Sequence, residues 1–139
     1  MSKNYNKIMV ALVGDGEEIE VVEHAYQLSN NLNCSLTAIH VNDPHAGEMS
    51  MMMDSPIAVN REALQKQLSD YLGDDIASNI DIIMDKNESI AKSIEQHTLD
   101  CDLLIVGHRK MSKFKATFMD SIDEGIANLI SCPVLVVQK

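Results

Sequence analysis

Positively charged residues are scarce in this sequence: 11 lysines and arginines stand against 21 aspartates and glutamates, which gives a net charge of −10. Nucleic acids and anionic lipids attract proteins that carry a positive field, so this balance argues against them as partners. No apolar run approaches the ~20 residues that a membrane helix requires, and residues 1–7 lack the apolar core of a signal peptide. We therefore expect a cytoplasmic protein that binds neither nucleic acid nor membrane.

Cysteine is also rare, and its placement excludes the common ligand patterns. Cys34, Cys101 and Cys132 are far apart and form no C-x-x-C or Cys/His motif. Each lies beside a predicted strand, so we expect three small buried thiols and no metal site among them. The 139 residues fit one domain, expected to cover 1–139.

Apolar runs without alternation predict strands that are buried on both faces of a sheet. Such runs alternate along the chain with helical patterns, as βαβ units do. With right-handed crossovers, this alternation predicts an α/β fold: a five-stranded, doubly wound parallel sheet of order 3-2-1-4-5 with helices on both faces. The predicted strands are residues 8–13, 35–41, 80–84, 103–106 and 134–137.

Four stretches show the apolar spacing of amphipathic helices. Asn87 or Ser89 can cap the third of these helices, and Ser121 and Glu124 form a capping box at the fourth. The apolar positions are Val21, Val22, Ala25, Leu28 and Leu32; Leu64, Leu68 and Leu72; Ile90, Ala91 and Ile94; and Ile122, Ile126, Leu129 and Ile130.

Ligands of open parallel sheets bind at the carboxyl ends of strands, where the strand order reverses. Gly14 follows the first predicted strand and Gly107 the fourth. A glycine there allows close approach of a ligand or simply makes a turn. Basic residues between 109 and 115 then lead into a helix, which favours either an anion site or a solvated basic loop.

Residues 42–59 form the one long irregular stretch, which we expect to be mobile. It contains His45 and Met49 with the methionine run 51–53, a set that suits Cu(I) or an adaptable apolar contact surface. Asp81 and Asp85 flank a strand and are expected to be solvated ends. No serine is paired by any motif with a histidine and an orienting acid, so we expect no enzyme activity.

Four segments, in order, resemble the universal stress protein family over nearly the whole chain: residues 7–14, 38–41, 102–108 and 132–137. The resemblance implies a Rossmann-like fold of the adenine nucleotide alpha hydrolase type. It also implies a homodimer that pairs through the last strand, where an exposed apolar edge needs a cover.

Members of that family that bind ATP carry G-x-x-G, nine further residues and G-[S/T] after the fourth strand. In this chain Gly107 matches the first glycine, and Ser121 matches the final hydroxyl. Lys110 and Asp120 stand where the other two glycines are expected. A side chain at these positions disfavours the left-handed backbone and the close approach of a phosphate.

ATP-binding members also place an aspartate beside the ribose at the end of the first strand. Here that position is Val13, whose side chain cannot accept a hydrogen bond. Val41, at the end of the second predicted strand, is expected to belong to the same vestigial site. The chain therefore resembles the UspA-like branch, in which the glycine motif is eroded. We expect a dimeric, non-enzymatic stress-response module without a cofactor; the alternative is an adenine-nucleotide (ATP or AMP) binder with slow hydrolysis.

Overall fold

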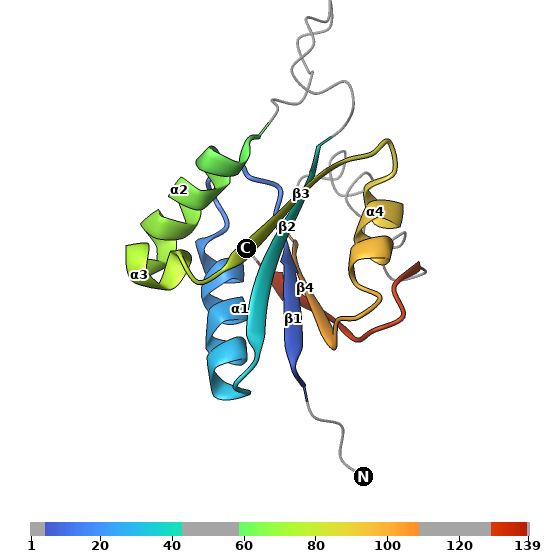
Figure 1. The fold of residues 1–139 in the computed structure, drawn as a ribbon, viewed down its shortest axis with the longest axis horizontal. Helices are drawn as coiled ribbons and strands as arrows, with labels where there is room; N and C mark the ends of the chain where they lie inside the picture. Colours follow the sequence, from blue (N-terminus) through green and yellow to red (C-terminus); the bar gives the residue numbers. More distant parts are fainter. Residues whose placement is uncertain (1–4, 43–58, 109–128, 139) are drawn as a thin grey trace, which may run out of the picture.

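Five parallel strands form the centre of the protein, and they lie in the order β3-β2-β1-β4-β5 (Figure 1). This computed structural model describes residues 5–42, 59–108 and 129–138. The sheet order and the parallel direction confirm the prediction from sequence. The strands are β1 (Lys7–Ala11), β2 (Ser35–Asn42), β3 (Asp81–Lys86), β4 (Leu103–His108) and β5 (Val134–Gln138).

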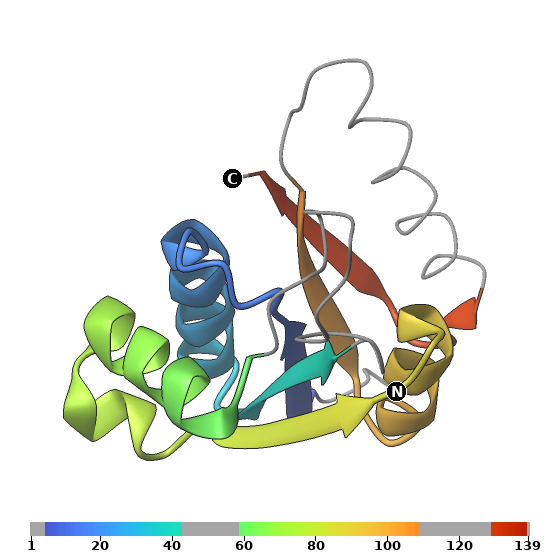
Figure 2. The same ribbon diagram turned by 90° about the horizontal axis from the view of Figure 1, so that it is seen from above.

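Helices cover both faces of the sheet, as expected of a doubly wound fold (Figures 1 and 2). Helices α1 (Ile19–Asn31), α2 (Arg61–Leu72) and α3 (Asp74–Ala77) lie on one face, and α4 (Ile90–His97) lies on the other. Each face has its own apolar cluster. Leu64 and Leu68 of α2 are completely buried on the first, and Ile94 of α4 is buried on the second.

Local sequence signals fix where the helices begin and end. The Asn60 carboxamide accepts a hydrogen bond from the Ala63 N–H at 2.8 Å and starts α2, and Gly73 ends it with a φ of +92°. Ser89, rather than Asn87, caps α4 by accepting from the Lys92 N–H at 3.3 Å. The capping box predicted at Ser121 lies outside the described residues. None of the helices in the described ranges is long and apolar enough to cross a membrane.

The sheet has a central strand whose two neighbours come from different halves of the chain. Val10 of β1 pairs with Ala38 of β2 on one side and with Ile105 of β4 on the other. The strand order therefore reverses at β1, and the carboxyl ends of β1, β2 and β4 meet at one edge of the domain. In an open parallel sheet this edge is the expected ligand side.

Candidate functional site

The turn that follows β1 is built around two glycines with a left-handed backbone. Gly14 has a φ of +77° and Gly16 a φ of +82°, a region that side chains disfavour. A Cβ at Gly14 would also lie 2.9 Å from a methyl group of Val59. Gly14 is therefore required for the turn and for contact with the chain before α2, so its role is structural.

A buried carboxylate organises this turn. Glu18 is only 1% exposed, and its Oε2 accepts from the Val13 N–H at 3.0 Å while its Oε1 accepts from the Gly14 N–H at 2.9 Å. The Glu18 N–H donates to the Tyr71 hydroxyl at 3.3 Å. Two backbone N–H groups at the ligand edge are thus bound by an anion that belongs to the protein itself.

A second polar link joins the segment after β1, the end of β2 and Val59, two residues before α2. His40 is 7% exposed, with Nδ1 2.8 Å from the Leu12 carbonyl oxygen and Nε2 3.0 Å from Asn42 Oδ1. The Asn42 amide nitrogen donates to the Val59 carbonyl at 2.9 Å, and its oxygen accepts from the Val59 N–H at 3.1 Å. Together with Glu18, this link is a buried polar network that sequence reasoning missed.

The two valines of the predicted site differ in exposure. Val13 is 52% exposed after the end of β1, at the position where the family resemblance implies an aspartate in ATP-binding members. Val41 is 8% exposed and packs in the cluster that includes Ile94 of α4. The exposed apolar side chain of Val13 offers no hydrogen bond to a ribose, and Val41 contributes mainly to the core.

Gly107 was predicted to follow the fourth strand, but it lies inside it. β4 continues to His108, and Gly107 pairs with Val137 of β5. The predicted end of β4 was the end of its apolar run. Pairing with β5 extends the strand past that run to Gly107 and His108. The other predicted site residues, Lys110, Asp120 and Ser121, lie outside the described residues, as do the basic segment and the methionine run.

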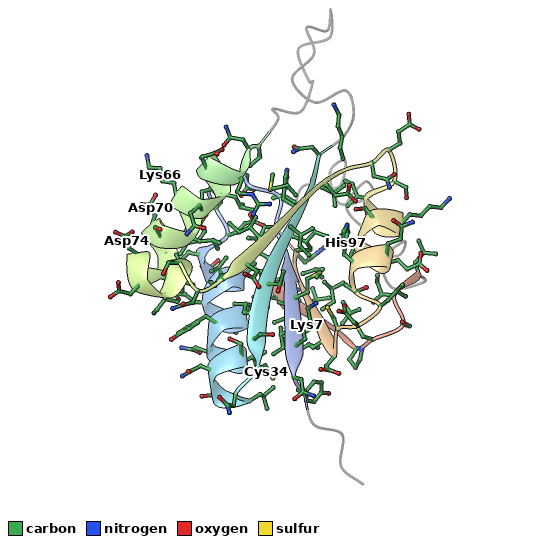
Figure 3. All side chains as sticks on the ribbon, in the orientation of Figure 1. Lys7, Cys34, Lys66, Asp70, Asp74 and His97 are labelled. Carbon is green, nitrogen blue, oxygen red and sulfur yellow. The ribbon has the colours of Figure 1, made fainter. Side chains whose placement is uncertain are left out.

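A cluster on the opposite face corrects the prediction that Asp85 is a solvated strand end. Asp85 lies within β3, and its Oδ2 accepts a hydrogen bond from the fully buried Ser93 hydroxyl of α4 and lies 3.2 Å from His97 Nε2. Figure 3 shows His97 on α4, on the side of the sheet away from α1 and α2 (Figure 3). The Ser93 hydrogen bond, followed in size by that from the Lys86 N–H, lowers the pKa of Asp85 from its usual 3.8.

This cluster has the residue types of a hydrolytic triad but a different connectivity. In a triad the serine donates to the histidine, which the carboxylate orients from its other side. Here both Ser93 and His97 are bound to Asp85, and the Ser93 side chain is completely buried. The arrangement holds α4 against β3 and supplies no nucleophile.

The thiols differ from the expectation of three buried cysteines. Cys101 is buried, and burial raises its pKa to about 11, whereas Cys34 and Cys132 are partly exposed. Cys34 lies at the amino-terminal end of the sheet (Figure 3), where its Sγ donates to the Tyr5 carbonyl. Across the residues that the structure describes, no group of three or more His, Cys, Asp or Glu side chains could hold a metal ion.

Comparison with known proteins gives a consistent result. A family model described as the universal stress protein family matches residues 4–138. A solved universal stress protein in complex with cAMP is 18% identical with a TM-score of 0.70, covering 98% of each chain. The universal stress protein UspA from Lactobacillus plantarum is 18% identical with a TM-score of 0.61, covering 98% of this chain and 99% of that chain.

A universal stress protein from Archaeoglobus fulgidus in complex with dAMP is 12% identical with a TM-score of 0.59, covering 97% of this chain and 99% of that one. At these identities the likeness to solved structures shows the fold. Among curated proteins, no significant match to the sequence is found.

Proposed function

Because this chain belongs to the universal stress protein family, we propose that it is a cytoplasmic, dimeric regulatory module with a degenerate nucleotide site and no catalytic role. One observation carries the proposal: the N–H groups of Val13 and Gly14 are bound by the buried Glu18 carboxylate. An anionic ligand at this turn would have to replace that carboxylate or lie beside it. Either costs free energy, since like charges repel in a site of low dielectric constant.

The sequence beyond β4 supports the same conclusion. Lys110 and Asp120 stand at two of the three glycine positions of the ATP-binding motif, while Gly107 keeps the first glycine and Ser121 the final hydroxyl. Val13 replaces the aspartate that would bind the ribose. At least three favourable contacts are missing, and each is worth on the order of 1.5–3 kcal/mol, where every ~1.4 kcal/mol changes affinity tenfold.

We therefore expect ATP with Mg²⁺ to bind with a dissociation constant weaker than about 100 µM, if it binds at all. Isothermal titration calorimetry at physiological salt measures this directly, and a value in the low micromolar range contradicts the proposal. Basic residues between 109 and 115 add at most ~1 kcal/mol of screened attraction. A repaired variant, Val13→Asp with Lys110→Gly and Asp120→Gly, should bind ATP more tightly than the wild type.

The second candidate function is adenine-nucleotide binding, with slow hydrolysis as its extreme form. It is favoured by the fold shared with structures that hold cAMP and dAMP. Native mass spectrometry of gently purified protein separates the two functions. A bound nucleotide mass supports the second candidate, and a bare protein mass supports the degenerate site.

The dimer is proposed to form through β5. This strand is one of the two edge strands of the sheet (Figure 2), and its Val136 and Leu135 residues are 46% and 37% exposed. An exposed apolar edge pairs readily with a second copy of itself. Multi-angle light scattering should give a dimer mass at micromolar concentration, and Val136→Lys should release monomers. Leu99→Lys, at an apolar residue 72% exposed beyond α4, is the matched control and should leave the dimer intact.

A further inference from the structure

Two of the three cysteines directly precede neighbouring strands of the sheet. Cys101 lies two residues before β4, and Cys132 lies two residues before β5. These strands are parallel neighbours, and their pairing extends back beyond β5, since the Leu104 N–H donates to the Pro133 carbonyl at 2.9 Å. The two cysteines therefore enter the same pair of strands from the same end.

The register of this pair sets the spacing of the two cysteines. Leu104 pairs with Val134, so the same register places Cys132 beside Asp102, one residue along the chain from Cys101. Neighbouring strands are ~4.8 Å apart and successive residues ~3.3 Å apart, which puts the two cysteine Cα atoms on the order of 6 Å from each other. Disulfides bridge Cα separations of about 4.4–6.8 Å.

Both cysteine side chains lie on the face of the sheet that α4 covers. Cys101 belongs to the apolar cluster of that face, and Cys132 packs against the same cluster. Burial raises the pKa of Cys101 to about 11; Lys7 opposes this shift, while negative charge on Asp100 and on Cys132 adds to it. Cys132 is thus near enough for its charge to act on the Cys101 thiol.

Cys34 starts the chain into a different part of the sheet. It directly precedes β2 and packs against the apolar cluster of the opposite face, and β1 lies between β2 and β4. Two strand spacings, or ~9.6 Å, therefore separate it from the chain before β4, which is too far for a disulfide. Cys34 is partly exposed, as Cys132 is, and so it serves as an internal control.

We propose that Cys101 and Cys132 form a reversible dithiol–disulfide pair that a peroxide oxidises within one chain. Cys132 reacts first because it is partly exposed and Cys101 is buried. Its thiolate attacks one peroxide oxygen, the O–O bond breaks, and a sulfenic acid forms. The Cys101 sulfur then attacks the sulfenic sulfur, the S–S bond forms, and the S–O bond breaks. With hydrogen peroxide, the two thiols lose two electrons and two protons, and the peroxide becomes two water molecules.

The disulfide covalently closes the chain between residues 101 and 132. This stretch contains the vestigial site residues Lys110, Asp120 and Ser121. Closing a loop removes conformational freedom from the unfolded chain, so the oxidised protein is more stable than the reduced one. A dithiol reductant reverses the reaction by thiol–disulfide exchange. In the proposed cytoplasmic setting the pair is reduced until an oxidant reaches it.

Peptide mass spectrometry of the oxidised wild-type chain tests the pair directly. Trypsin separates the three cysteines, since Cys34, Cys101 and Cys132 fall in peptides 8–61, 93–109 and 116–139. After one equivalent of hydrogen peroxide and blocking of free thiols, peptides 93–109 and 116–139 should be linked, and dithiothreitol should release them. The linked chain should run as a monomer on a non-reducing denaturing gel. A disulfide to Cys34 or between two chains, or no disulfide at all, overturns the proposal.

Three variants separate the roles of the cysteines. Cys34→Ser should form the disulfide as the wild type does, whereas Cys132→Ser should form none. Cys101→Ala removes the second thiol, so the sulfenic acid on Cys132 should persist and be trapped by dimedone. Dimedone on Cys34 with Cys132 unmodified contradicts the assigned order. Cys132→Ser changes a partly exposed residue, so it keeps the test decisive if Cys101→Ala does not fold.

Urea unfolding compares the oxidised and reduced forms. A disulfide that closes a loop of this length should lower the unfolding equilibrium constant by about 30- to 1,000-fold. Dithiothreitol should abolish the difference, and Cys132→Ser should give one curve under both conditions. An oxidised wild type that is less stable than the reduced form contradicts the spacing inferred from the register, because a disulfide of the wrong geometry stores strain.

Discussion

Two aspartates on β3 that look equivalent in sequence should respond very differently to substitution. Asp81 begins the strand and is exposed, whereas Asp85 accepts the hydroxyl hydrogen bond of the completely buried Ser93. In Asp85→Ala the Ser93 hydroxyl loses its acceptor, and an unsatisfied buried donor costs about 1–3 kcal/mol. A serine in a helix can instead donate to a carbonyl one turn earlier, which places the expected loss at about 1–2 kcal/mol.

The contact with His97 adds little to this magnitude. The Asp85 side chain is 31% exposed and the His97 side chain 34% exposed, at a separation of 3.2 Å. Solvent screens such a pair, so it contributes at most about 0.5 kcal/mol. Asp81→Ala is the matched control on the same strand, and its effect should stay within about 0.5 kcal/mol.

Urea denaturation at pH ~7 measures both variants, and acidification supplies a second signature. The pKa of Asp85 is lowered in the folded state, chiefly by Ser93. The stabilisation is therefore present above the unfolded-state value near ~4 and is lost as pH falls through the folded-state value. The wild-type and Asp85→Ala free energies of unfolding should converge in acid. Equal losses for the two alanine variants at pH ~7, or a difference that persists unchanged in acid, would refute this account.

Two further predictions concern the turn after β1 and the thiols. Gly14→Ala should lower the free energy of unfolding by about 1–3 kcal/mol, because the residue has a φ of +77° and a Cβ would lie 2.9 Å from Val59; urea denaturation is the measurement, and an unchanged midpoint contradicts it. Iodoacetamide at pH ~8 should alkylate Cys101 more slowly than Cys34 and Cys132, since Cys101 is buried with a pKa of about 11; peptide mass spectrometry gives the order.

The sheet could be predicted from sequence because its signal is carried by composition within each strand. Ile8, Val10, Leu104 and Ile105 are at most 1% exposed, and apolar runs of this kind are typical of parallel strands covered on both faces. The predicted helix containing Leu64 is confirmed for a different reason: Leu64 and Leu68 recur at helical spacing, and both are completely buried in α2. The predicted end of β4 was wrong because Gly107 pairs with Val137 of β5 and so belongs to the strand. The residues of β4 alone cannot indicate that pairing.

The polar networks could not be predicted because each depends on how separate elements are placed in space. Asp85 meets Ser93 only because α4 packs across β3 in one particular orientation. His40 carried a weak signal, since it is a polar residue inside an apolar strand, but its partners Leu12 and Asn42 follow from the register of the sheet. Glu18 follows a glycine-rich turn, but nothing in its place in the sequence indicates that its carboxylate binds the N–H groups of Val13 and Gly14.

At the carboxyl edge of this sheet, unlike in an open ligand site, several backbone groups are already bound to other groups of the protein. The Val13 and Gly14 N–H groups are bound to Glu18, the Leu12 carbonyl faces His40, and Asn42 is bound to Val59. Groups that other doubly wound domains can direct to a ligand are here paired within the protein. A ligand at this turn must therefore compete with these internal partners. The proposed loss of nucleotide affinity thus has a second physical cause besides the replaced glycines, which is that the Val13 and Gly14 N–H groups are already bound to the Glu18 carboxylate.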